Sequence, residues 1–199
     1  MDAHDAALLT TQLAMGFALA ACVGVRTFLP LLAAGVLARL GYVSLGEHFE
    51  WMAKTPALVV FGSAAAFEVL ADKVPWFDHA LHAAEAFVKP IAGTLIAASV
   101  LTELDPVTAI TLGLIAGGTV AGLVQALRGT VRVASTALTG GLGNPVLSVF
   151  DDAAATVGLV LAFVVPVLAA IVVIAVAVLL GRLFFRGRSA NAGITPPSA

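Results

Sequence analysis

The chain has 199 residues, of which 60% are hydrophobic and 11% are charged, with a formal net charge of −2 and a mean hydropathy of +1.05. A soluble domain is about 45–50% apolar and about 25% charged, so this composition excludes an ordinary soluble enzyme and a disordered chain. The acidic balance excludes a nucleic-acid binder, and the single cysteine excludes an internal disulfide and a cysteine-built zinc site. The composition predicts a small all-α polytopic membrane protein.

Runs of residues without an ionisable group predict where the chain crosses the bilayer. The long runs cover residues 6–25, 106–127 and 153–181, and each can span a hydrocarbon core of about 30 Å. Shorter runs at 27–38, 55–67, 90–102 and 133–150 require tilt or a re-entrant path. The acidic N-terminus predicts no cleaved signal peptide. The basic end of the last span predicts a cytoplasmic C-terminus, followed by a disordered tail at 189–199.

Two motifs occur twice and predict an inverted repeat. Val25-Arg26 and Val131-Arg132 each precede a glycine by nine residues, and Thr55-Pro-Ala-Leu-Val-Val-Phe resembles Asn144-Pro-Val-Leu-Ser-Val-Phe. Chance similarity in an alanine-rich chain is the alternative. The predicted repeats cover residues 6–104 and 106–185 of one membrane domain, residues 1–188.

Each repeat is expected to contain a long span, a short segment, a proline-initiated span and a last span. The short segments are residues 26–38 and 132–143, the proline-initiated spans 56–72 and 145–165, and the last spans 90–103 and 167–181. An interfacial helix is expected at 76–89. The fold class is therefore about six transmembrane helices plus two short re-entrant or half-helix segments. With both termini inside, seven of the ten Lys and Arg residues lie on the cytoplasmic side.

Polar side chains within this apolar chain are the candidates for a functional site. Arg26 and Arg132 would form an anion site near the converging short segments, or else structural ion pairs. The Gly140–Pro145 stretch offers hydroxyl and amide contacts to a solute, or simply a tight turn. Carboxylates at membrane depth are functional candidates by default, and together these groups would form a proton-coupled solute site or an internal ionic lock. The predicted pathway residues are Arg26, Glu68, Asp72, Arg132, Ser135, Thr136, Thr139, Asn144, Asp151 and Asp152.

A second polar stretch follows Pro75. Asp78, His82 and Glu85 recur at spacings of four and three, with His79 beside them, which is one face of a helix. Such a face could bind a divalent metal or relay protons, or it could be the solvated side of an interfacial helix.

These motifs resemble a family of bacterial integral membrane proteins known as domain of unknown function 4126. The resemblance rests on Glu68…Ala71-Asp-Lys-Val-Pro75…Asp78-His79, on Ser135–Pro145…Ser148…Asp151-Asp152, and on Arg26-Thr-Phe-Leu-Pro-Leu-Leu. The family pattern usually has Glu-Asp at the position of Asp151-Asp152. The resemblance implies a multi-pass location in the bacterial inner membrane and a shared polar core, and it implies no reaction.

Three functions fit the sequence. A small-solute or ion transporter or channel is the leading hypothesis, with its polar site between the two repeats. The alternatives are an intramembrane enzyme acting on a lipid headgroup and a non-catalytic assembly partner, for which Gly113…Gly117 is a helix-packing signal. The chain contains no HExxH, GxSxG or nucleotide-binding loop, so an enzyme is less favoured. We expect the protein to contact the lipid bilayer and to form a homodimer around the pathway. We expect neither a cofactor nor a nucleic-acid partner.

Overall fold

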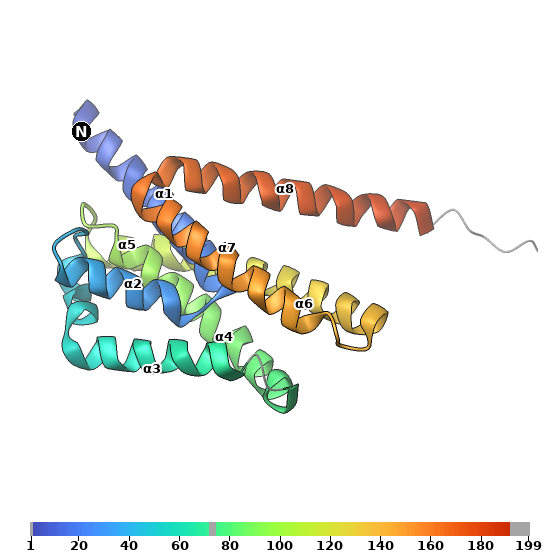
Figure 1. The fold of residues 1–199 in the computed structure, drawn as a ribbon. Helices are drawn as coiled ribbons and strands as arrows, with labels where there is room; N and C mark the ends of the chain where they lie inside the picture. The colour runs from blue at the N-terminus through green and yellow to red at the C-terminus, as the bar shows by residue number, and fades with distance from the viewer. Residues whose placement is uncertain (1, 72–74, 192–199) are drawn as a thin grey trace, which may run out of the picture.

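A computed structural model shows the chain as a bundle of packed helices (Figure 1). The structure describes residues 2–71 and 75–191, and within them the side chains other than those of 75–83, 177, 180, 181 and 183–191. No strand occurs in these ranges. The elements are α1 (Ala3–Val25), α2 (Phe28–Arg39), the 3₁₀ helix η1 (Glu47–Ala53), α3 (Thr55–Ala71), α4 (Pro75–Ser99), α5 (Pro106–Leu112), the π-helix η2 (Gly113–Gly118), α6 (Thr119–Thr139), α7 (Asn144–Val164) and α8 (Pro166–Asn191).

Length and composition identify the helices that can cross a membrane. Within the described residues these are α1, α7 and the continuous helix Pro106–Thr139 that α5, η2 and α6 form together. A fourth span is added if η1 and α3, which meet at a bend of 63°, are taken as one. Large apolar side chains remain exposed on the outside of the bundle, for example Val59, Val60, Phe67, Val160 and Ile171, which is typical of a surface in contact with lipid. The chain is thus an all-helical, multi-pass membrane protein by these criteria, with three to four candidate spans where the sequence predicted about six.

The predicted interfacial helix at 76–89 and the predicted span at 90–103 are instead parts of one helix, α4. Its Pro90 lies inside the helix, and its Glu85 and Lys89 are buried. The charges of this stretch suggested a solvated face, but two of them point into the bundle and find partners there.

The two predicted repeats are built differently around their arginines. The first half has the expected short helix α2 directly after Arg26, but α6 continues through Arg132 to Thr139, so the predicted separate segment at 132–143 is wrong. That helix ends only where Gly140 and Gly141 adopt φ values of +62° and +91°, which glycine tolerates without a steric penalty. The proline-initiated helices α3 and α7 do begin at the matched positions Thr55 and Asn144. The inverted repeat itself stays a prediction.

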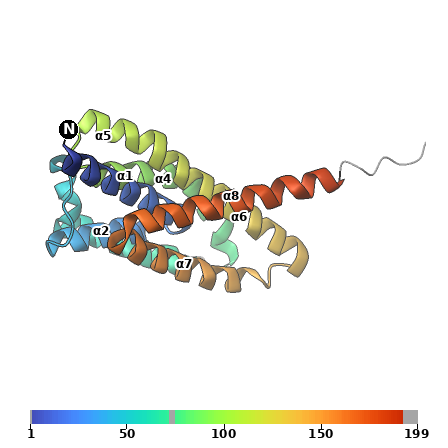
Figure 2. The same cartoon turned by 90° about the horizontal axis from the view of Figure 1, so that it is seen from above.

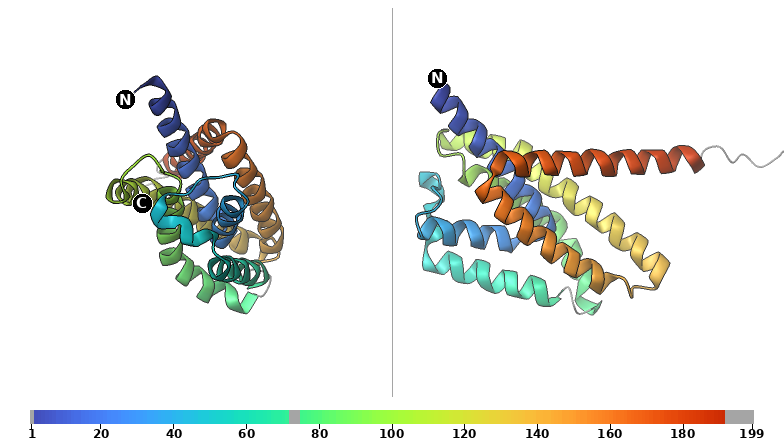
Figure 3. Two further views of the ribbon diagram at one scale, coloured as in Figure 1. Left: turned by 90° about the vertical axis from the view of Figure 1, so that its left-hand side faces the viewer. Right: turned by 45° about the horizontal axis from the view of Figure 1, so that its top comes forward.

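The reversal of chain direction between α1 and α2 has no counterpart at Arg132 in the second half. Figures 1 and 2 show α2 turning back from the end of α1, a reversal that the straight helix α6 does not make. As a result, α1 begins and α8 ends at opposite ends of the bundle (Figure 3). The side of the membrane on which each terminus lies stays a prediction.

Small residues allow the central helices to approach closely. A Cβ atom on Gly117 would lie 2.4 Å from the carbonyl oxygen of Gly93 on α4, and one on Gly113 would lie 2.7 Å from that of Thr94. The Gly113…Gly117 signal is therefore used within the chain, between η2 and α4. The buried core beside this contact contains Leu19, Val23, Ile96 and Ala121.

Candidate functional site

The backbone break between α1 and α2 is closed by two charged side chains from later helices. Arg26 is extended, with φ −129° and ψ 116°, and ends α1. The backbone N–H groups of Thr27 and Phe28 donate to the Glu68 carboxylate of α3 at 2.8 and 3.2 Å, and the Lys89 ammonium of α4 donates to the carbonyl of Val25 at 3.3 Å. Helix N-termini favour anions and C-termini favour cations. Each end of the break thus receives the charge that stabilises it.

The Arg26 side chain binds α7 in the same region. One guanidinium nitrogen, Nη2, lies 2.6 Å from Oδ1 of Asp152 and donates to the Ser148 hydroxyl at 3.2 Å. Arg26, Glu68, Lys89 and Ser148 are at most 2% exposed. We call these five residues (Arg26, Glu68, Lys89, Ser148 and Asp152) the break cluster.

A second group of charges joins α6 to α7. Asp151 Oδ2 accepts from Arg128 Nε at 2.6 Å and from Arg132 Nη2 at 3.4 Å. We call Arg128, Arg132 and Asp151 the cavity cluster. Because Asp151 and Asp152 are adjacent on α7, the two clusters lie side by side.

Glu85 connects the two clusters. Its Oε2 lies 3.0 Å from the Lys89 ammonium and 3.7 Å from Arg128 Nη1. Gln125 accepts from Lys89 at 2.7 Å and donates to Glu85 at 3.5 Å. Buried charges are costly unless they are paired and hydrogen-bonded, and in the described part of the chain four cations and four carboxylates share this network. They are Arg26, Lys89, Arg128 and Arg132, with Glu68, Glu85, Asp151 and Asp152.

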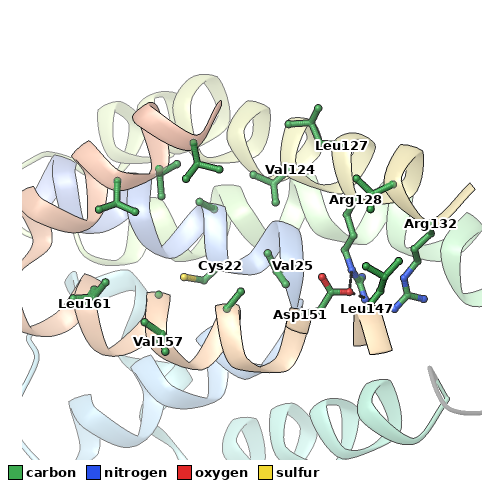
Figure 4. A pocket seen from close by; sticks show the side chains of 17 residues that line it. Cys22, Val25, Val124, Leu127, Arg128, Arg132, Leu147, Asp151, Val157 and Leu161 are labelled. Atoms are coloured by element: carbon green, nitrogen blue, oxygen red, sulfur yellow. Dashed lines mark hydrogen bonds and ion pairs between the residues drawn. The ribbon is translucent and has the colours of Figure 1, made fainter. Parts of the chain in front are cut away.

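The cavity cluster stands at the end of an apolar cavity of about 490 Å³ between α1, α6, α7 and α8 (Figure 4). The walls are Val, Leu, Ala, Gly and Cys22, and Arg128, Arg132 and Asp151 are the charged residues among them. Val131, Val157, Val172 and Val176 of the wall are 42–59% exposed, so the cavity is open to the surroundings of the bundle rather than sealed. Its size is within the range of about 300–1,000 Å³ usual for ligand sites.

The structure brings together half of the predicted pathway residues. Arg26, Glu68, Arg132, Asp151 and Asp152 all belong to the network above. Asp72 lies outside the described residues.

The four other predicted pathway residues form the turn between α6 and α7 instead. The Thr139 hydroxyl donates to the Ser135 carbonyl at 2.7 Å and accepts from the Gly143 N–H at 3.0 Å, while the Asn144 amide donates to the Thr136 hydroxyl at 3.0 Å. These contacts are local to the turn.

The predicted metal-binding face gains no support. The side chains of Asp78, His79 and His82 lie outside the described residues, and Glu85 contacts Lys89, Arg128 and Gln125. Among the described residues, no group of three or more His, Cys, Asp or Glu residues is placed to hold a metal ion.

Sequence reasoning missed Lys89, Arg128, Gln125 and Ser148. The spacing of charged residues in the sequence could have identified two of them, Arg128 and Lys89. Arg128 precedes Arg132 by four residues and Glu85 precedes Lys89 by four, so each pair shares one face of a helix.

Comparison with known proteins identifies the family of the chain. No curated protein and no solved structure matches the chain significantly. Residues 13–186, most of the chain and including every residue of both clusters, match the family described as domain of unknown function (DUF4126). The chain belongs to the DUF4126 family.

Proposed function

We propose that this protein is a small membrane carrier whose solute site is the cavity between α1, α6, α7 and α8. The observation that carries the proposal is the position of the cavity cluster. Three buried or half-buried charged side chains lie at one end of an otherwise apolar space that is open to the surroundings of the bundle. Charges that only lock helices together do not require such a space beside them, whereas a solute site combines apolar walls with a few polar groups.

The network gives such a site a connection to the rest of the molecule. Asp151 of the cavity cluster is adjacent to Asp152, which binds Arg26 at the break between α1 and α2. Glu85 links Arg128 to Lys89, which binds the carbonyl end of the same break. A solute that rearranges Asp151 or Arg128 would therefore act on the backbone break, the point where the direction of the chain reverses. We also propose that the basic end of α8 faces the cytoplasm, as its Arg182, Arg186 and Arg188 predict.

Flux measurements on proteoliposomes test the proposal. A panel of small organic anions, cations and neutral solutes is applied by concentration jump to vesicles that contain the wild-type protein, the Ala154→Phe variant or the Ala153→Phe variant. Both alanines are exposed on α7, but only Ala154 lines the cavity. We expect at least one solute to give a protein-dependent flux that Ala154→Phe abolishes and Ala153→Phe leaves intact. A panel without protein-dependent flux, or equal effects of the two variants, contradicts the proposal.

A further inference from the structure

We infer that the ligand of this cavity is a single-chain amphiphile with a singly charged carboxylate head, such as a long-chain fatty acid anion. The inference rests on the proposed function, because it names the solute class for the same cavity. The head would lie between Arg128 and Arg132, and the alkyl chain would lie along the valine and leucine walls.

The chemistry of the cavity is strongly asymmetric. Away from the cavity cluster its wall consists of aliphatic side chains, glycine and Cys22, contributed by all four helices. Such a wall binds hydrocarbon by removing it from water and offers almost no hydrogen-bond partners to a polar solute. This excludes a sugar, an amino acid or a hydrated ion as the molecule that fills the space.

The charged end selects the head group. Asp151 already places one carboxylate oxygen between the two guanidinium groups, at 2.6 Å from Arg128 Nε and 3.4 Å from Arg132 Nη2. The geometry is thus that of an occupied carboxylate site, and arginine binds carboxylates through charge-assisted hydrogen bonds. Two cations and one anion line the wall at this end, and Glu85, outside the wall, lies 3.7 Å from Arg128 Nη1, so a ligand with one negative charge meets less repulsion here than one with two.

The same geometry makes Asp151 a competitor of the ligand. An incoming carboxylate must share or replace the position of Asp151 between the arginines. The side chain of Asp151 is 20% exposed, whereas Arg128 and Arg132 are at most 8% exposed. The arginines are therefore the fixed part of the site and the aspartate is its more accessible part. Neutralising Asp151 should consequently strengthen ligand binding, the reverse of what removal of an ordinary binding residue does.

Equilibrium binding of radiolabelled dodecanoate to the full-length protein in phosphatidylcholine nanodiscs tests the inference, with empty nanodiscs as background. We expect saturable binding that unlabelled dodecanoate displaces and that acetate and dodecanol do not. Asp151→Asn should tighten binding about tenfold, the order of one charge-assisted contact, while Glu50→Gln, at an exposed carboxylate outside both clusters, should leave it unchanged. Ala154→Phe should remove saturable binding and Ala153→Phe should not.

Several results would overturn the inference. Absence of saturable binding, displacement by dodecanol as efficient as by dodecanoate, or weaker binding to Asp151→Asn would each do so, and tighter binding of dodecyl phosphate would overturn the carboxylate assignment. Thermal unfolding of each variant identifies those that fail to fold, and Asp151→Asn remains decisive because its expected effect is a gain. Dodecanoate binding without any flux would contradict the carrier proposal alone, whereas flux of another solute without dodecanoate binding would contradict this inference alone.

Discussion

The break cluster and the cavity cluster use the same residue types for different purposes. Each pairs an arginine with one of two adjacent aspartates of α7, Asp152 in the first and Asp151 in the second. In the break cluster the partners of Glu68 and Lys89 include backbone groups of the α1–α2 junction, and the charges replace missing helical hydrogen bonds. In the cavity cluster the arginines bind a side chain at the edge of an open space. The role of a buried charge thus follows from what lies next to it rather than from its burial.

The largest expected effect is on the break cluster. Glu68→Gln keeps the shape of the side chain but removes one acceptor oxygen and the charge that faces the N-terminus of α2. Loss of a charged hydrogen bond that leaves a buried donor without a partner should lower the free energy of unfolding by about 3 kcal/mol. Thermal unfolding in detergent, followed by circular dichroism, measures this. The matched control is Glu50→Gln, at an exposed glutamate of η1, and an equally small effect of both substitutions would contradict the assigned role of Glu68.

Substitution of two neighbouring alanines of α7 tests whether one side of this helix faces the cavity while the other is closely packed in the core. Ala155 is 0% exposed, while Ala154 is exposed and lines the cavity. Ala155→Leu should overpack the core and cost about 1–3 kcal/mol, whereas Ala154→Leu should be nearly neutral. The comparison uses denaturant titration of both variants under one condition. Equal costs would show that the region between α7 and its neighbours is packed alike on both sides.

Ser148 gives a smaller and more local test of the break cluster. Its hydroxyl accepts a hydrogen bond from Arg26 and is 2% exposed, so Ser148→Ala should lower the free energy of unfolding by about 1–2 kcal/mol. Ser63→Ala is the control, because the exposed Ser63 hydroxyl donates only to the Val60 carbonyl of its own helix. Dodecanoate binding should not change in either variant. If Ser148→Ala lost dodecanoate binding without a change in the free energy of unfolding, the break cluster would be part of the binding site, which contradicts its separation from the cavity cluster.

The smallest effect is expected at an exposed charge outside both clusters. Asp105 caps the N-terminus of α5, where hydrogen bonds from the hydroxyl and the backbone N–H of Thr108 hold the pKa of its carboxyl below the usual range. A lowered folded-state pKa contributes stability above the unfolded pKa of about 3.9, and this contribution is lost as the pH falls through the folded pKa. Asp105→Asn retains a good capping residue without the titration. The wild-type unfolding temperature should therefore fall slightly further between pH 5 and pH 2, by about a degree or two, than that of the variant, and identical profiles would contradict this.

Much of the fold follows from local sequence. Long apolar runs predicted α1 and most of the helix Pro106–Thr139, and Pro56 and Pro145 marked the starts of α3 and α7, because proline fits the first turn of a helix and disfavours its interior. The pairing of Arg26 with carboxylates of a distant helix also followed from the cost of an isolated charge in an apolar chain.

The remaining features depend on contacts between distant residues. Glu85 and Lys89 have the same spacing whether they are solvated or buried, and only the position of Gln125 and Arg128 on α6 decides between the two. The break after Arg26 depends likewise on where Glu68 and Lys89 are placed. The cavity is formed by side chains of four helices, and no single segment contains its pattern.

The closure of the break between α1 and α2 has a consequence for biosynthesis. Glu68 lies 41 residues after Thr27, Lys89 lies 64 residues after Val25, and Ser148 lies 122 residues after Arg26. Translation proceeds at about 5–20 residues per second, so the first two helices wait for several seconds with their junction unsealed. Until α7 has been made, Arg26 lacks both Ser148 and Asp152. The junction between α1 and α2 is therefore synthesised early but is among the last parts of the chain to reach its final set of contacts.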